Sequence, residues 1–248
     1  MCLIVFAWRP GHAQPLVVAA NRDEFYARPS KPLAHWAESP QVYAGRDLEA
    51  SGTWLGIGPN GRFAALTNIR EPHKPPARRS RGELVSDFLS GDISIGEYFK
   101  NVGQRSVDYA GFNLLLGTAD QLWHFNSRDV TAQPVEPGLH GISNAGLDTP
   151  WPKLLKARAA LNEVLVDPQP QALLALLKDS QTAPFSELPD TGVGLATESL
   201  LSSVFIASPT YGTRASTALI VNADGSRVMV ERSFGPSGAR LGEVTLTV

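Results

Sequence analysis

Apolar runs separated by turn residues dominate the first third of the chain. Leu3 to Trp8 and Leu16 to Ala20 flank a Pro-Gly turn, and the runs 53–57 and 62–67 flank Pro59-Asn60-Gly61. Short apolar runs bounded by Pro and Gly are typical of buried strands, and Asn-Gly supplies the positive φ that a tight turn requires. The pattern therefore predicts two antiparallel hairpins.

Helical signals follow these hairpins. Ser80-x-x-Glu83 and Ser94-x-x-Glu97 match the capping box, in which the first side chain accepts from the backbone N–H three residues later. The two boxes predict short helices over 83–89 and 95–104.

A second helical block is predicted in the second half of the chain. Thr149 is a good N-cap with Pro150 at the first helical position, and a further short helix is expected over 171–178. The remaining apolar runs predict strands over 112–116, 122–125, 130–135, 138–143, 204–207, 215–222, 226–234 and 243–248.

Blocks of antiparallel strands interrupted by two helical blocks indicate the α+β fold class. We expect two mainly antiparallel sheets that face each other, with helices on their outer faces. The sequence has no repeat of fixed period and no sharp shift of composition that would mark a linker. We therefore expect residues 1–248 to form a single domain.

Composition narrows the function classes. The 248 residues are 43% hydrophobic and 19% charged, as in ordinary globular proteins, and 22 Lys and Arg stand against 24 Asp and Glu. Without a global positive field we expect no nucleic acid partner. Leu3 to Trp8 is far shorter than the roughly 20 residues that cross a bilayer, and no basic segment precedes it. We expect a cytoplasmic protein without a membrane span.

Common binding motifs are out of context or absent. The stretch 56–61 matches the dinucleotide fingerprint G-x-G-x-x-G, but a predicted strand follows where a helix is needed, so we interpret its glycines as a turn. The five histidines are scattered: His12, His35, His73, His124 and His140. With a single cysteine, they predict no metal site and no internal disulfide. A haem needs only one axial His or thiolate, so this dispersion is compatible with haem binding.

A proline-containing basic segment precedes the first predicted helix. Its members are Arg70, His73, Lys74, Arg78, Arg79 and Arg81. We favour a solvated run of charge. The functional alternative is a rim that attracts carboxylates or phosphates, in which Arg78 and Arg79 would contact the substrate.

Cys2 is the most informative residue. A free cysteine is usually a small buried hydrophobe, but removal of Met1 would place a thiol and an α-amine on one residue. The α-amine has a reference pKa near 7.7–8.0, so it can take the thiol proton at neutral pH. Such a residue would be both nucleophile and base.

Charged residues that could support Cys2 follow the second predicted strand. Asn21-Arg22-Asp23-Glu24 comes directly after the apolar run 16–20, and a hairpin would bring this tetrad near the start of the first strand. A carboxylate there could orient the amine. The alternative is a polar strand exit with an internal ion pair, which contributes little if it is exposed.

Several strings, in order along essentially the whole chain, resemble the NRDE family, also called transport and Golgi organisation protein 2. The strings are Met1-Cys2, Ala20-Asn21-Arg22-Asp23-Glu24, Thr53-Trp54-Leu55-Gly56, Leu66-Thr67-Asn68, Gly141-Ile142-Ser143-Asn144, Asp148-Thr149-Pro150-Trp151-Pro152-Lys153 and Tyr211-Gly212-Thr213-Arg214. The resemblance implies an N-terminal-nucleophile hydrolase fold, a four-layer αββα sandwich. Its plan is similar to that of the cysteine acylases that cleave penicillin V or conjugated bile acids.

The resemblance also implies roles near the nucleophile. Cys2 matches the nucleophile and Asp23 the aspartate that orients the amine. Arg22 matches the family's early arginine only approximately, because the spacing around it differs. Arg214 matches a late arginine near the nucleophile.

Two further residues match oxyanion donors. Asn68 corresponds to the residue that gives a backbone N–H, and Asn144 to the residue that gives a side-chain amide. Trp54, which lies in one of the matched strings, is assigned to substrate binding together with Arg78 and Arg79.

Two functions of different classes follow from the resemblance. The first is a cysteine hydrolase, without a cofactor, that cleaves an amide, ester or thioester of a small acyl or lipid-like substrate such as an acyl-CoA. The alternative is a non-catalytic protein of haem binding, haem trafficking or lipid homeostasis, because family members have been connected with those processes. A scaffold without a working pocket is a third. We favour the hydrolase, since chemistry explains the nucleophile constellation better than packing does.

Overall fold

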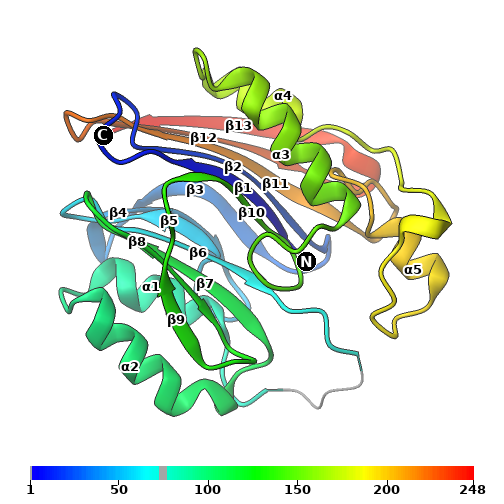
Figure 1. The fold of residues 1–248 in the computed structure, drawn as a ribbon, viewed down its shortest axis with the longest axis horizontal. Coiled ribbons are helices and arrows are strands. Elements are labelled where there is room, and N and C mark those ends of the chain that lie inside the picture. The colour runs from blue at the N-terminus through cyan, green and yellow to red at the C-terminus, as the bar shows by residue number, and fades with distance from the viewer. Residues whose placement is uncertain (1, 73–76) are drawn as a thin grey trace. The chain divides into compact units, whose positions relative to one another are not determined.

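The computed structural model describes residues 2–72 and 77–248, which form two compact units (Figure 1). The first unit contains the described residues of 1–27, 70–72 and 137–248, and the second those of 28–69 and 73–136. Met1, His73 and Lys74 carry predictions made above but lie outside the described residues. The expectation of a single domain over 1–248 stays a prediction.

The first unit is built on a six-stranded sheet in the order β10-β1-β2-β11-β12-β13. Its strands are β1 (Cys2–Trp8), β2 (Leu16–Phe25), β10 (Gly138–Ile142), β11 (Tyr211–Val221), β12 (Arg227–Phe234) and β13 (Arg240–Thr247). Neighbouring strands are antiparallel throughout. β1 and β2 each pair with a neighbouring strand on both sides, so hydrogen bonds fix the backbone of the residues at their ends.

Helices cover one face of this sheet. They are α3 (Pro152–Val164) and α4 (Pro170–Leu176). The first unit also contains α5 (Leu195–Leu200) and three-residue 3₁₀ turns at Phe185–Glu187 and Pro236–Gly238. Leu3, Val5 and Ala7 of β1 pack in one core with buried leucines of α3 and α4. Since side chains alternate along a strand, Cys2 lies on the face of β1 away from that core.

The second unit is built on a seven-stranded sheet in the order β3-β4-β5-β6-β7-β8-β9, again antiparallel. Its strands are β3 (Ser30–Trp36), β4 (Ser39–Asp47), β5 (Leu55–Ile57), β6 (Phe63–Asn68), β7 (Phe112–Gly117), β8 (Leu122–Asn126) and β9 (Thr131–Pro134). Helices α1 (Gly82–Ser90) and α2 (Ile95–Arg105), with a 3₁₀ turn at Ser106–Asp108, pack on one face. Phe88 and Tyr98 join the two helices edge to face, with ring centroids 5.3 Å apart.

Local turn and cap chemistry confirms several predictions. The β5–β6 hairpin turns through Asn60 and Gly61 at φ values of 54° and 72°, so the glycines of 56–61 belong to a strand pair. The Ser94 side chain caps α2 by accepting from Glu97 N at 3.2 Å. The N-terminal hairpin is also as predicted.

Three predictions are wrong. The capping box at Ser80 does not form: the N-cap of α1 is Arg81, without a side-chain cap, and Ser80 Oγ accepts from Gly82 N at 3.3 Å instead of from Glu83 N.

A predicted strand and a predicted helix start are also wrong. Residues 204–207 form no strand; buried Val204 and Ile206 instead lie in a loop whose backbone bonds to Asn21 and Thr213. Helix α3 begins at Pro152, after a turn in which Trp151 N donates to Thr149 O, so neither Thr149 nor Pro150 starts it. The competing turn takes the residues that the cap pattern assigned to the helix.

Candidate active site

Cys2 begins β1 and is only 5% exposed. It stands directly opposite Arg22 in the β1–β2 register, so the hairpin brings the charged tetrad to the thiol as the sequence suggested. Burial is the main cause that raises the pKa of the Cys2 thiol, and the Asp23 charge raises it further. The Arg22 charge and a hydrogen bond from the Asp23 backbone lower it. A thiol in this setting requires a base before it can attack.

Asp23 is a buried carboxylate, 2% exposed, on β2. Thr213 Oγ1 on the neighbouring strand β11 donates to Asp23 Oδ1 at 2.8 Å. Burial raises the pKa of Asp23, whereas the Lys153 charge, the Thr213 hydrogen bond and the Arg22 charge lower it. Burial therefore disfavours the ionised carboxylate, and the two cations favour it. An ionised carboxylate at this position could orient an amine.

Asn144 follows β10 and is 1% exposed. Its neighbour Ser143 bridges it to the nucleophile, because Ser143 Oγ lies 3.2 Å from Cys2 O and 3.2 Å from Asn144 Oδ1. Asp148 anchors the loop by accepting from Gly141 N at 2.8 Å and contacting His140 Nδ1 at 2.7 Å. The predicted oxyanion donor is thus fixed at the start of β1.

Lys153 is a functional candidate that the sequence analysis missed. It sits in the first turn of α3, is 2% exposed, and its Nζ lies 3.5 Å from Asn144 Oδ1. Burial lowers the pKa of Lys153 from 10.5 to about 8, although the charges of Asp23 and Cys2 raise it. Its place at the end of a matched string was the available signal; its burial was not visible.

Arg70 departs from the solvated charge run favoured for the basic segment. Its guanidinium forms a buried ion pair with Glu198 of α5 and lies 4.6 Å from the ring centroid of Trp151. Its backbone N donates to Asn144 O at 2.8 Å. Arg70 therefore belongs to the framework around Asn144, and the interpretation as solvated charge is wrong for this residue.

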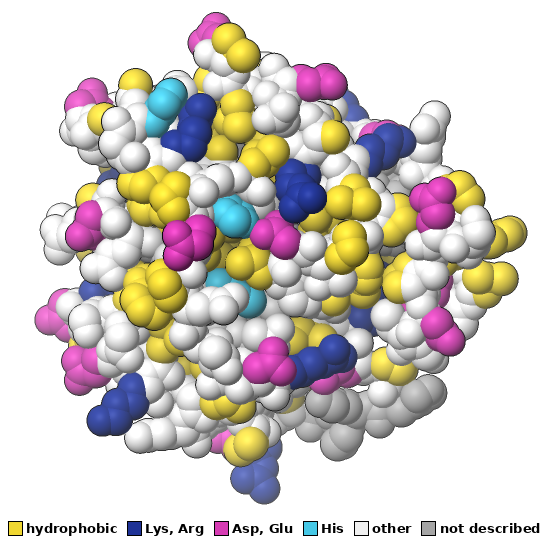
Figure 2. All heavy atoms as spheres, in the orientation of Figure 1, with side chains coloured by type: hydrophobic (Ala, Val, Ile, Leu, Met, Phe, Trp, Pro, Cys, Tyr) yellow, Lys and Arg dark blue, Asp and Glu magenta, His cyan; other side chains and the backbone are white. Residues whose placement is uncertain are grey.

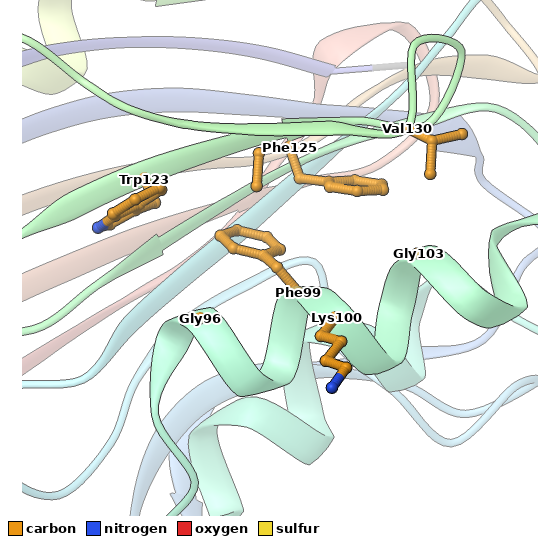
Figure 3. Close-up of a pocket in the computed structure, with 8 residues that line it drawn as sticks. Gly96, Phe99, Lys100, Gly103, Trp123, Phe125 and Val130 are labelled. Carbon is orange, nitrogen blue, oxygen red and sulfur yellow. The ribbon is translucent and has the colours of Figure 1, made fainter.

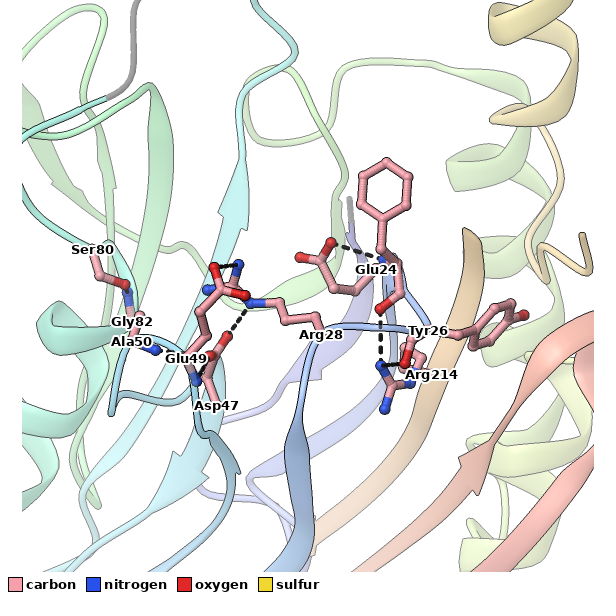
Figure 4. A network of polar contacts seen from close by, with 10 residues as sticks. Glu24, Tyr26, Arg28, Asp47, Glu49, Ala50, Ser80, Gly82 and Arg214 are labelled. Carbon is pink, nitrogen blue, oxygen red and sulfur yellow. Dashed lines mark hydrogen bonds and ion pairs between the residues drawn. The ribbon is translucent and has the colours of Figure 1, made fainter. Parts of the chain in front are cut away.

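Arg214 lies at a β-bulge between Thr213 and Ala215 on β11. Its guanidinium points toward the end of β2, where it donates to Phe25 O at 2.9 Å and Tyr26 O at 3.1 Å (Figure 4). These bonds hold the strand exit after the tetrad. The role of Arg214 near the nucleophile stays a prediction.

The other predicted site residues belong to the second unit. Asn68 ends β6, and Trp54 is buried before β5, where its backbone O accepts from Leu66 N. Arg79, which precedes α1, pairs with Glu83 in its first turn, and exposed Arg78 lies 3.9 Å from Asp108. Their roles in substrate binding and oxyanion stabilisation stay predictions.

A shallow groove of about 390 Å³ lies in the second unit between α2 and the strands β8 and β9 (Figure 3). Phe99, Trp123 and Phe125 line it together with Val130, and Lys100 stands at its edge. It contains none of the predicted site residues. The groove is therefore mainly apolar and shares no residue with the candidate site.

Three further observations concern surface charge, membrane-spanning helices and metal sites. Acidic and basic side chains are interspersed on the face drawn in Figure 2. Across residues 2–72 and 77–248 no helix combines the length and apolarity needed to cross a bilayer, and no group of three His, Cys, Asp or Glu has the geometry of a metal site.

Sequence comparison identifies relatives along almost the whole chain. The family model described as "Transport and Golgi organisation 2" matches residues 1–236. The "Transport and Golgi organization protein 2 homolog" of Homo sapiens is 38% identical over 257 residues, covering 94% of this chain and 93% of that protein. The Drosophila melanogaster "Transport and Golgi organization protein 2" is 28% identical over 266 residues, with 94% and 92% covered.

A solved structure shares the fold. The Caenorhabditis elegans N-acylethanolamine-hydrolyzing acid amidase ortholog superposes with a TM-score of 0.53 at 12% identity, covering 90% of this chain and 96% of that one. At this identity the likeness shows the fold alone. The predicted α+β class with an N-terminal-nucleophile hydrolase-like fold is therefore confirmed.

Proposed function

The chain belongs to the transport and Golgi organisation 2 family, and from this premise we propose that it is a cysteine hydrolase with Cys2 as the nucleophile. Its substrate would be an amide, ester or thioester of a small acyl or lipid-like group. The structural neighbour hydrolyses N-acylethanolamines by its printed name, and these are amides, so an acyl amide is the first class to test.

One observation carries the proposal: buried polar groups converge on the start of β1. Asp23, Asn144 and Lys153 are each at most 2% exposed. Burying a carboxylate, an amide and an ammonium group costs free energy, which apolar residues of similar volume would avoid. Strongly perturbed ionisable groups beside a thiol are typical of catalytic sites.

The proposed reaction begins after removal of Met1. The Cys2 α-amine, oriented by Asp23, takes the thiol proton, and the thiolate sulfur attacks the substrate carbonyl carbon. The Asn144 amide donates to the oxyanion, with Asn68 as the second donor that the resemblance implies. As the intermediate collapses, the carbon–nitrogen, carbon–oxygen or carbon–sulfur bond breaks, and the protonated α-amine of Cys2 gives its proton to the leaving group.

A thioester between Cys2 and the acyl group remains. Water then attacks this carbonyl while the α-amine accepts a water proton, and the carboxylic acid leaves as the thiolate regains that proton. No cofactor enters either step. The alternative that the resemblance implied is a haem carrier, which a haem titration separates from this scheme.

Intact mass spectrometry before and after a limiting dose of iodoacetamide tests the starting condition. Cys2 is the only cysteine, so a mass shift reports this one site. We expect loss of Met1 and rapid alkylation, and a Cys2→Ala control should not react. An intact Met1 with an inert thiol would contradict the proposal.

A turnover panel tests the chemistry itself. It contains an N-acylethanolamine, a p-nitrophenyl acyl ester and an acyl thioester, each assayed with the wild type, Cys2→Ala and Asn144→Ala. We expect turnover that Cys2→Ala abolishes and that Asn144→Ala slows about 10² to 10³-fold in kcat. Protein lacking Met1 without Cys2-dependent turnover of any member, and with a saturable Soret band on haem titration, would favour the carrier.

A further inference from the structure

The side-chain amide of Asn144 has one accepting and one donating end, and only the donating end can stabilise an oxyanion. Asn144 Oδ1 lies 3.5 Å from Lys153 Nζ and 3.2 Å from Ser143 Oγ. An ammonium group has three donors and no acceptor, so the amide atom that faces Lys153 must be the oxygen. Lys153 thereby fixes which way round the Asn144 amide stands.

The ammonium group of Lys153 also interacts with charged residues around the Cys2 thiol. Asp23 of β2, Cys2 of β1 and Glu198 of α5 favour its protonated form, and Arg70 disfavours it. In turn the Lys153 charge lowers the pKa of Asp23 more than any other single group does. Lys153 and Cys2 are both buried, and the contacts of Asn144 Oδ1 with Lys153 Nζ and Ser143 Oγ, and of Ser143 Oγ with Cys2 O, connect the two residues. A thiolate at Cys2 would therefore interact with this cation at low dielectric.

Resting on the proposed hydrolase, we infer that Lys153 is a positioning residue: through Asn144 Oδ1 it turns the amide Nδ2 toward the developing oxyanion, and its charge favours the Cys2 thiolate. The substrate does not need to touch Lys153. Its effect passes through Asn144 and through the electrostatic field at Cys2.

The geometry gives a matched control on the same helix. Lys156 lies one turn further along α3, where its side chain is 48% exposed and pairs with Asp179. Lys153→Met and Lys156→Met therefore remove the same chemical group from the same helix. Only the first removes it from the surroundings of Cys2.

The first measurement needs no substrate. The rate of iodoacetamide alkylation is followed against pH for the wild type, Lys153→Met, Lys153→Arg and Lys156→Met, with folding checked by urea denaturation. We expect Lys153→Met to move the alkylation midpoint up by about one pH unit, because a nearby cation is lost. Lys153→Arg should return it toward the wild type, and Lys156→Met should leave it unchanged.

The alkylation result decides the charge role whatever the turnover panel shows. A Lys153→Met profile that superimposes on the wild type overturns the inference, and so does a Lys153→Arg profile equal to that of Lys153→Met. Absence of turnover by wild-type protein would instead count against the proposed function. The two failures are therefore distinguishable.

The second measurement is a double-mutant cycle in kcat on whichever panel member the wild type turns over. We expect Lys153→Met to lower kcat about 100-fold with less than a threefold change in KM. In the Asn144→Ala background the same change should lower kcat less than tenfold. Equal losses in both backgrounds would show that Lys153 does not act through Asn144.

Discussion

Arg70 and Glu198 form an ion pair in which each side chain is only 3% exposed. Glu198 Oε1 also accepts from Thr191 N at 2.9 Å and from Thr191 Oγ1 at 2.5 Å. Because Arg70 N donates to Asn144 O, the pair ties α5 to the loop that carries the predicted oxyanion donor. The contact is thus part of the framework of the candidate site.

Breaking this pair from one side should destabilise the protein strongly. Glu198→Ala leaves the Arg70 guanidinium buried without its carboxylate, which typically costs about 3–5 kcal/mol, and Arg70→Met leaves Glu198 in the same position. Replacing both with apolar residues, as in Arg70→Met with Glu198→Leu, should recover much of the loss. Urea denaturation of the three variants measures these differences.

An exposed ion pair of the same unit provides the control. Lys156 and Asp179 are 48% and 30% exposed, so Lys156→Ala should cost less than about 1 kcal/mol. If Glu198→Ala costs as little as Lys156→Ala, the Arg70 pair does not stabilise the fold as its burial implies.

Local signals explain why much of the fold was predictable. Asn60-Gly61 and Ser94 act through neighbouring backbone atoms, so the pattern alone identifies the turn and the cap. β3 and β4 received no prediction because bulges interrupt their register and break the alternation of apolar and polar positions. Periodicity fails wherever the strand itself is irregular.

The part of the candidate site that depends on the order of residues along the chain and on the N-terminal hairpin was predictable. Cys2 and Arg22 meet because β1 and β2 pair along the chain. Lys153 and Glu198 were missed because their importance depends on burial, which arises from the packing of α3 and α5 rather than from local sequence. A charged residue in an amphipathic helix gives no local sign that it points inward.

Thr213→Val should weaken the candidate site through Asp23. The substitution removes the hydroxyl that donates to Asp23 Oδ1 and leaves Ile206 N without its side-chain acceptor. A hydrogen bond to a buried charged group is typically worth about 1.5–3 kcal/mol, so we expect a stability loss of that order. Because this bond lowers the pKa of Asp23, its loss should also move the acid limb of any pH–rate profile to higher pH.

The conservative variant separates the two causes. Thr213→Ser keeps a hydroxyl at the same position and should retain both the stability and the acid limb, as measured by urea denaturation and kcat/KM against pH. A Thr213→Ser variant as impaired as Thr213→Val would contradict the prediction, because it would show that the hydroxyl bonded to Asp23 does not account for the loss.

Two glycines of the second unit should respond to alanine in opposite ways. A Cβ at Gly52 would lie 2.4 Å from the backbone carbon of Gly82, so Gly52→Ala must displace the start of α1 and should destabilise by more than about 2 kcal/mol. A Cβ at Gly96 meets nothing within 4 Å, and alanine favours the helix, so Gly96→Ala should stabilise by about 0.5–1 kcal/mol. Thermal and urea denaturation would reveal equal effects if this close approach is absent.

The burial of Lys153 should change how the free energy of unfolding depends on pH. Its pKa is about 8 in the folded protein and near 10.5 in the unfolded chain, so between these values the unfolded state binds more protons. The free energy of unfolding should therefore rise with pH across this window, by up to about 3 kcal/mol relative to Lys153→Met. Below pH 8 both states carry the charge and the difference should be flat.

The background of this experiment matters because Cys2 titrates nearby with the opposite sign. Burial raises the pKa of its thiol, so the contribution of this thiol to the free energy of unfolding falls as pH rises. Comparing Cys2→Ala with Cys2→Ala/Lys153→Met from pH 6 to 10.5 removes this contribution, and Cys2→Ala/Lys156→Met supplies the exposed control. Divergence of the two curves above pH 8 then reports the ammonium group of Lys153. Parallel curves would mean that Lys153 is not buried beside Asp23 in solution.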